Sequence, residues 1–280
     1  MDPKPVDVVI ISGQSNAVGC TQCDYIKKWD AEKYYDYQAG FDGVKIAYDC
    51  WTRENRPGKD PIYYSQNHSK DHNFTNIYLG QGNGLSTFGP EIGIGEELNE
   101  SQRGKLFLVK YACGASNIKE DWTERDSPMY PRFINFIKLQ MENLKKQGYI
   151  GTIKAFCWMQ GEGDAYPGHC EKNLYGQNLS KFVSQVREDL KEFLKDDTLP
   201  FIDATINNTP GVWPKPNEVN ESKRWFEQQS ENNYLIDTQE EGLHTDQEPY
   251  SSPDRAHYDS ESQVKLGHLF AQAFKPFLSE

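Results

Sequence analysis

Two absences narrow the function of this chain before any motif is considered. It has no apolar run of the length that crosses a bilayer, and basic residues are in deficit, with 30 Lys and Arg against 42 Asp and Glu and a formal net charge of -12 at pH 7. Binding to a nucleic-acid backbone or an anionic membrane depends on surface positive charge. We therefore expect no nucleic acid and no membrane among its partners, and neutral ligands suit this surface better.

Metal-binding cysteine patterns are also scarce. Cys20 and Cys23 form a lone C-x-x-C, whereas a structural zinc site needs a second set of ligands, so no metal is expected. Two cysteines that end apolar runs are expected to be buried thiols, and four in loop-like sequence are candidates for pairing in an oxidising compartment. The buried pair is Cys113 and Cys157, and the other four are Cys20, Cys23, Cys50 and Cys170. The start, MDPKPVD, lacks a signal-peptide pattern, as a processed chain would, and we favour a secreted mature chain over a cytoplasmic one.

The most informative stretch is residues 6–19, VDVVIISGQSNAVG. Its nearly continuous β-branched run is typical of a strand buried on both faces of a parallel sheet. Gly13 permits a sharp turn, which places Ser15 just past the carboxyl end of the strand, where open α/β sheets bind their ligands. Taken alone, Ser15 fits a helix cap as well as a nucleophile.

Amphipathic helices and short apolar strands alternate from residue 90 onward. The patterns predict helices over 90–98, 132–146, 179–194, 218–230 and 262–277, and strands over 106–112, 153–159, 200–206 and 234–236. This alternation predicts an α/β fold, a three-layer α/β/α sandwich with a central parallel sheet, in one domain over residues 1–280. The polar, aromatic segment at about 20–88 is predicted to be a long insertion over the carboxyl edge of the sheet.

The loops that follow successive strands meet at one edge of such a sheet, and here they carry the groups that acyl transfer needs. A serine becomes nucleophilic near neutral pH when a general base takes its proton. His257 is the candidate base for Ser15, and Asp254, three residues before it, is placed to orient the imidazole. His244, followed by Asp246, is the competing candidate.

An oxyanion formed at the attacked carbonyl needs converging hydrogen-bond donors. We expect them to be the Ser15 N–H at a helix start, the Gly114 N–H on a turn without a side chain, and the side-chain amide of Gln160. No metal or organic cofactor is required for this chemistry.

Five motifs in order resemble one known group of enzymes. They are G-Q-S-N after the first strand, G-P-E at 89–91, the glycine after the second strand, W-x-Q-G-E-x-D at 158–164 and D-x-x-H-Y-D at 254–259. Together they resemble the sialate O-acetylesterase and acetylxylan esterase group, carbohydrate esterase family six and its relatives in the SGNH hydrolase superfamily. The resemblance spans nearly the whole chain. GQSN stands where the wider superfamily has GDSL, and Gln160 where many members have asparagine.

The resemblance implies a flavodoxin-like SGNH hydrolase fold and the removal of acetyl groups from sugar hydroxyls. Carried over to this chain, it makes Ser15 the nucleophile, His257 the base, Asp254 its orienting acid, and Gly114 and Gln160 oxyanion donors alongside the Ser15 N–H.

Other residues near these motifs are candidates for supporting roles. Glu162 is expected either to brace the Gln160 loop or to act on His257 as a second acid. The candidate substrate-binding residues are Asn16, Trp122, Tyr166 and Trp213.

The predicted function is a serine acetylesterase acting on acetylated carbohydrate, with plant cell-wall glycans such as acetylxylan as the first substrate class. A sialate O-acetylesterase or another short-chain acyl esterase is the alternative, and a non-catalytic carbohydrate-binding module is the alternative of another class. A long-chain acyl esterase would need a long apolar channel, which the polar segment at 20–88 does not suggest. The oligomeric state is left open by the sequence.

Overall fold

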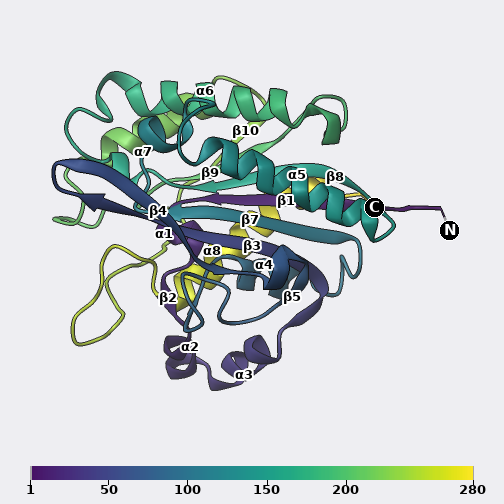
Figure 1. The fold of residues 1–280 in the computed structure, drawn as a ribbon. Helices are drawn as coiled ribbons and strands as arrows, with labels where there is room; N and C mark the ends of the chain where they lie inside the picture. The colour runs from purple at the N-terminus through teal and green to yellow at the C-terminus, as the bar shows by residue number, and fades with distance from the viewer. Residues whose placement is uncertain (1, 280) are drawn as a thin grey trace.

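A central, mostly parallel sheet organises the protein, whose computed structural model describes residues 2–279 (Figure 1). The strand order is β10-β9-β8-β1-β7-β3-β4, with β5 also paired to β3. The pairings of β3 with β4 and with β5 are antiparallel, and the others are parallel. The strands are β1 (Lys4–Gly13), β3 (Phe41–Arg56), β4 (Lys59–His68), β5 (Thr75–Ile77), β7 (Leu106–Gly114), β8 (Tyr149–Met159), β9 (Phe201–Ala204) and β10 (Asn233–Ile236).

The strand β1 lies at the middle of the sheet, between β7 and β8. Four consecutive residues from Val8 to Ile11 are fully buried. A strand with a neighbour on each edge and helices over each face has no solvated side, which is why its sequence is a continuous β-branched run.

Helices cover both faces of the sheet (Figure 1). One face carries α5 (Tyr130–Lys146), α6 (Leu174–Asp189) and α7 (Pro216–Glu227), and the other carries α4 (Glu91–Leu98) and α8 (Ser260–Phe274), with α2 (Cys23–Trp29) and α3 (Ala31–Ala39) outside them. Each of the longer helices buries one apolar stripe, as Phe133, Ile137 and Leu144 do on α5. The predicted three-layer α/β/α fold is confirmed.

The segment at 20–88 differs from the expectation of an insertion outside the sheet. Within it, β3 runs parallel to β7 as a full member of the sheet. The strand is buried from Val44 to Cys50, except that Lys45 is half-buried. Because Lys45 and Asp49 interrupt the apolar run, the sequence pattern concealed this strand. The rest of the segment forms α2, α3, the β3–β4 hairpin and a small sheet of β2 (Thr21–Gln22) and β6 (Thr87–Phe88).

Parallel strands end at a common edge of the sheet, and the loops that leave β1, β7 and β8 therefore meet there. The short helix α1 (Ser15–Val18) follows β1 at this edge, and the loop before α8 reaches the same place (Figure 1). Within residues 2–279, no helix is both long enough and apolar enough to span a bilayer.

Candidate active site

Ser15 begins α1 and lies on the wall of a cavity of about 530 Å³ at the carboxyl edge of the sheet. Gly13, with φ +137°, makes the turn before it, and a Cβ there would lie 2.0 Å from the Met159 main-chain oxygen. The next residue, Gln14, donates its N–H to that same oxygen at 2.8 Å. This close approach of β1 to β8 requires glycine and fixes the direction in which Ser15 leaves the strand.

His257 lines the same cavity as Ser15. Its Nδ1 is 2.7 Å from Oδ2 of Asp254, and the carboxyl group also accepts the Ala256 N–H at 3.1 Å. The hydrogen bond from His257 lowers the pKa of Asp254, so this carboxylate stays ionised and holds Nδ1 protonated. In that tautomer, Nε2 is the free base.

Cys20 also lines the cavity. Burial disfavours the charged imidazole of His257, but hydrogen bonds with Asp254 and Cys20 outweigh it, so the pKa of His257 is raised above its ordinary value. At a pH where an ordinary histidine is already deprotonated, the imidazole of His257 is therefore still mostly protonated.

His244, the competing candidate, does not line this cavity. His244 is exposed, and its main chain bonds to residues at the start of α8. Its N–H donates to Ser262 Oγ at 2.8 Å, and its carbonyl accepts the Asp259 N–H. The structure therefore brings His257, and not His244, to Ser15.

Asn16 is not on the substrate side of the cavity, contrary to the expectation that it binds substrate. It is fully buried, and its Nδ2 donates to Glu162 Oε1 at 2.8 Å while its Oδ1 accepts the Tyr258 N–H at 3.1 Å. Its carbonyl accepts from Gln263 Nε2 at 3.0 Å. Asn16 thus ties α1, which begins with Ser15, to the loop that carries His257, and its contacts are those of a positioning residue.

Glu162 is fully buried behind this junction. One carboxyl oxygen holds Asn16, and the other has no hydrogen-bond partner among residues 2–279. Burial raises the pKa of Glu162, and none of the hydrogen bonds in the described chain joins it to His257. Its contacts show a role in orienting Asn16 and do not include the contact with His257 that a second acid would make.

The loop after β7 contributes to the wall of the same cavity. Gly114 and Ala115 both line the cavity, and Ala115 has φ +58°, a left-handed conformation that is uncommon for a residue with a side chain. Backbone in this region costs on the order of 1–3 kcal/mol and persists where the surroundings impose it, often at functional sites. β7 ends at this turn, and Gly114, which has no side chain, lines the cavity together with Ser15.

Gln160 lies outside the cavity, contrary to its predicted role as an oxyanion donor. It is fully buried, and its Nε2 donates to Asp164 Oδ2 at 2.6 Å and to the Ser116 carbonyl at 3.1 Å. An amide has two N–H groups, and here they are shared among three acceptors inside the protein, the third being Gln14 Oε1 at 3.2 Å, so none is left for the cavity.

Gln14, the residue before Ser15, places a side-chain amide on the cavity wall. Three N–H groups converge on its Oε1, from Gln160 Nε2 at 3.2 Å, Gly161 at 3.2 Å and Gly163 at 3.1 Å. These donors fix which end of the amide is oxygen. Its Nε2 has no partner among residues 2–279 and is not enclosed by protein, so it is presented to the cavity next to Ser15. Gln14 belongs to the G-Q-S-N motif, but the sequence pattern alone assigned it no role.

Of the three aromatic candidates for substrate binding, two line the cavity and one is buried in the hydrophobic core. Tyr166 and Trp213 line the cavity, with their ring centroids 6.5 Å apart in an edge-to-face arrangement. Trp122 is fully buried and packs edge-to-face on Trp158 at 5.3 Å and on Phe133 at 5.9 Å. The expectation that Trp122 binds substrate is therefore wrong, since it belongs to the aromatic core beneath α5 and α6.

Several cavity residues come from the polar segment at 20–88, where no motif marks them. They are Cys20, Thr52, Arg53, Asn55 and Asn83. All but Cys20 and Asn83 lie on β3, so the strand that the sequence pattern concealed also supplies part of the site.

The described residues contain no group of three or more His, Cys, Asp or Glu side chains able to hold a metal ion. All six cysteines are free thiols, and five of them are buried. The four that were candidates for pairing do not pair in this structure.

Ser15 and the Asp254–His257 pair thus lie at the carboxyl edge of the parallel sheet in an α/β sandwich. The family described as carbohydrate esterase, sialic acid-specific acetylesterase, matches residues 5–276. The chain belongs to this family, and it is an esterase.

Solved structures of low sequence identity share the fold. A protein from Arabidopsis thaliana is 23% identical with a TM-score of 0.67, covering 99% of this chain and 100% of that one. NanS is 17% identical with a TM-score of 0.62, over 99% of this chain and 98% of that one. A carbohydrate acetylesterase from Xanthomonas citri is 16% identical with a TM-score of 0.59, over 97% of this chain and 56% of that one. No curated protein matches the chain.

Proposed function

We propose that the protein is a serine carbohydrate O-acetylesterase, which removes acetyl groups from the sugar hydroxyls of plant cell-wall glycans such as acetylxylan. The observation that carries this proposal is one cavity lined by Ser15, by the His257 of an Asp254–His257 pair, and by the two aromatic side chains Tyr166 and Trp213. Aromatic faces stack on sugar rings, and a cavity of about 530 Å³ has room for a sugar acetate.

The first half of the reaction forms an acetyl-serine. His257 Nε2 takes the proton of the Ser15 hydroxyl while Ser15 Oγ attacks the acetyl carbonyl carbon. The oxygen of that carbonyl gains the negative charge and accepts hydrogen bonds from the N–H groups of Ser15 and Gly114 and from Gln14 Nε2. When the tetrahedral intermediate collapses, the bond to the sugar oxygen breaks and that oxygen takes the proton from His257.

The second half releases acetate. His257 Nε2 takes a proton from a water molecule, whose oxygen attacks the acetyl-serine carbonyl. The same three donors stabilise the second oxyanion, and Ser15 Oγ leaves with the proton from His257. Within residues 2–279 no hydrogen bond joins the Ser15 hydroxyl to His257, and we expect this bond to form in the substrate complex, since catalytic hydrogen bonds are often long in unliganded enzymes.

A sialate O-acetylesterase is the second candidate because the matching family carries that specificity in its description. The two substrates differ in charge, since sialic acid bears a carboxylate and xylose does not. Arg53 lines the cavity, but its guanidinium is already bonded to Glu120 at 2.5 Å and lies 3.5 Å from Asp121. The charge of Arg53 is compensated by these two carboxylates, which favours the neutral sugar in the cavity.

The test is acetate release from acetylated xylan, an O-acetylated sialic acid and a long-chain ester, each with the native protein and with Ser15→Ala. We expect release from acetylated xylan to exceed the other two and to disappear in the variant. Faster release from the sialic acid would transfer the proposal to that substrate. Binding of xylan without any release would replace the proposal with the non-catalytic binding module.

A further inference from the structure

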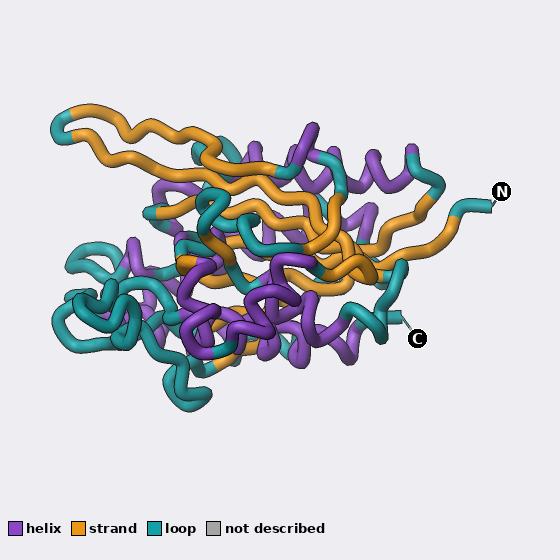
Figure 2. Tube along the Cα trace, turned by 90° about the horizontal axis from the view of Figure 1, so that it is seen from below, coloured by secondary structure: helices purple, strands orange, loops and turns teal. Residues whose placement is uncertain are grey.

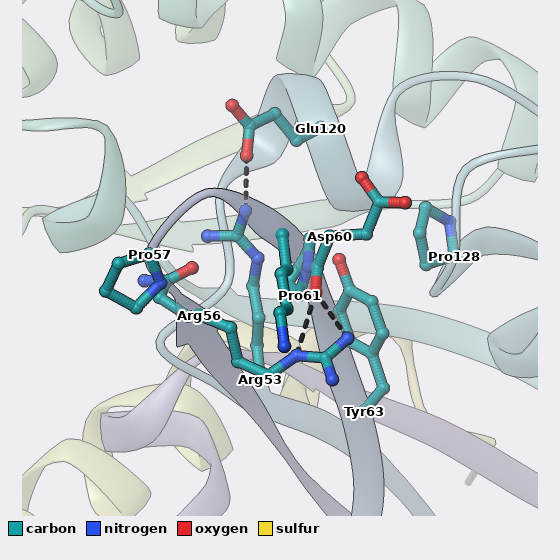
Figure 3. A pocket seen from close by; sticks show the side chains of 10 residues that line it. Arg53, Arg56, Pro57, Asp60, Pro61, Tyr63, Glu120 and Pro128 are labelled. Carbon is teal, nitrogen blue, oxygen red and sulfur yellow. Dashed lines mark hydrogen bonds and ion pairs between the residues drawn. The ribbon is translucent and has the colours of Figure 1, made fainter.

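A second hollow, of about 710 Å³, lies beside the catalytic cavity against the β3–β4 hairpin (Figure 3). We call it the hairpin groove. It is lined by Arg53, Asn55, Arg56, Pro57, Lys59, Asp60, Pro61, Tyr63, Glu120 and Pro128. Arg53 and Asn55 line the catalytic cavity as well, so the two hollows adjoin. A ligand longer than the unit in the cavity therefore has a continuous path into the groove.

The hairpin that builds this groove projects beyond the body of the protein, where Figure 2 shows it as the longest paired extension. β3 is buried as far as Cys50 but exposed from Glu54 to Arg56, and most of β4 is exposed. A two-stranded ribbon without a core on either side gains little stability from packing. The outer half of the hairpin is therefore not explained by the stability of the sheet, and its inner side forms a wall of the groove.

The charges in the groove are unequally compensated. Arg53 is paired with Glu120, whereas Arg56 directs Nε and Nη2 to the main-chain oxygen of Asp60, at 3.0 and 2.7 Å. These bonds orient the Arg56 guanidinium but do not neutralise it. Neither Arg56 nor Lys59 has a carboxylate partner within residues 2–279, and Figure 3 shows the Asp60 carboxylate turned toward Pro128.

The groove lining holds three cations, Arg53, Arg56 and Lys59, against the carboxylates of Asp60 and Glu120, and this positive excess contrasts with the acidic character of the protein, whose formal net charge is -12. A guanidinium held in place by its neighbours matches the two oxygens of a carboxylate, and a nearby lysine adds a second positive charge. Tyr63, with its hydroxyl donated to Asp121 at 2.5 Å, contributes a fixed aromatic ring to the same wall. A sugar ring that carries a carboxylate satisfies each of these features.

We propose that the hairpin groove is a second sugar subsite, which binds a carboxylate-bearing unit of the glycan chain whose acetylated unit occupies the catalytic cavity. This inference rests on the proposed function. It makes the substrate an acidic oligosaccharide or polysaccharide and separates recognition of the acid, in the groove, from deacetylation of a neutral unit beside Ser15.

The test compares three acetylated substrates: xylose, a neutral xylo-oligosaccharide, and a xylo-oligosaccharide of equal length with a glucuronic acid side group. The variant is Arg56→Gln with Lys59→Gln. Its charge-matched control is Lys145→Gln with Lys146→Gln, two exposed lysines at the far end of α5. Exposed ion pairs contribute ~0.2–1 kcal/mol each, so we expect kcat/KM on the acidic substrate to fall about fivefold to tenfold in the groove variant.

The expected pattern also includes unchanged kcat/KM on acetylated xylose for both variants and no loss in the control on any substrate. The proposal is overturned if the groove variant keeps native kcat/KM on the acidic oligosaccharide, or if the native protein does not prefer it to the neutral one. If no substrate is deacetylated, the proposed function has failed. Calorimetric binding of the unacetylated acidic oligosaccharide then decides the groove, with weaker binding to the groove variant supporting it and equal binding rejecting it.

Discussion

Replacing Gln14 by glutamate isolates the oxyanion contact from the fold. The glutamate keeps an oxygen where Gln160 Nε2, Gly161 N–H and Gly163 N–H converge at 3.1–3.2 Å, so these buried donors remain bonded. What changes is the other end of the side chain, where an N–H donor becomes an oxygen. Loss of one oxyanion donor costs about 10²–10³ in kcat. An acceptor oxygen facing the developing charge adds repulsion, so Gln14→Glu is expected to lie at or beyond the upper end.

Gln160→Met is the paired variant, since it removes the amide that the sequence pattern indicated. Gln160 Nε2 serves Asp164 and Ser116 inside the protein, so its loss leaves buried acceptors unpaired at about 1–3 kcal/mol each. We expect a lower melting temperature and less than a tenfold change in kcat of the folded enzyme.

The assay is steady-state hydrolysis of an acetylated sugar together with thermal unfolding of both variants. The expected pattern is a loss of kcat of a hundredfold or more for Gln14→Glu, and a lower melting temperature with kcat within tenfold of native for Gln160→Met. If Gln14→Glu keeps kcat within tenfold while Gln160→Met loses a hundredfold or more, the assignment of Gln14 as an oxyanion donor is refuted and the Gln160 prediction is restored.

Two further predictions follow from the cavity walls. The base must be neutral to act, and the hydrogen bond with Cys20 helps to raise the pKa of His257, so kcat/KM should increase with pH through an apparent pKa above the ordinary 6.5. Cys20→Ala should shift this increase to lower pH. An unchanged pH profile would show that Cys20 does not act on the histidine. Trp213→Ala should raise KM for sugar acetates severalfold with little change in melting temperature, because Trp213 lines the cavity. Trp122→Ala should lose about 3–5 kcal/mol of stability with KM unchanged, because Trp122 is buried in the core. Equal KM values for the two variants would show that Trp213 does not bind the sugar.

Local sequence was sufficient to predict the parts of the site that depend on neighbouring residues. The β-branched run before Gly13 predicts a buried strand and a turn, and the structure places Ser15 at that turn. Asp254 and His257 are three residues apart, so a single loop brings them into contact. These relations involve only short stretches of chain, and the residue types constrain them strongly.

The remaining errors concern contacts between distant segments. Gln14 and Gln160 both carry an amide near the carboxyl edge, and contacts with distant residues decide which amide faces the cavity. The buried Asp164 accepts a hydrogen bond from the Gln160 amide, whereas the N–H groups of Gly161 and Gly163 hold the Gln14 oxygen. Trp122 belongs to the core because α5 and α6 pack over it, which its polar sequence neighbours do not indicate.

The strand β3 was hidden for a related reason. Lys45 and Asp49 lie on a strand of the main sheet, and their side chains are paired by Asn76 and Ser65 from neighbouring strands. The sequence pattern shows only that these two residues are polar. It does not show the partners from elsewhere in the chain that allow polar side chains on a strand of the main sheet.

In the proposed mechanism, Ser15 carries the acetyl group during turnover. The most direct measurement is mass spectrometry of the protein quenched during hydrolysis of an acetylated xylo-oligosaccharide, with the peptide containing Ser15 sequenced. We predict one added acetyl group on Ser15, absent from Ser15→Ala and from protein mixed with the unacetylated sugar. Turnover retained by Ser15→Ala, or an acetyl group on another residue such as Cys20, would contradict this mechanism.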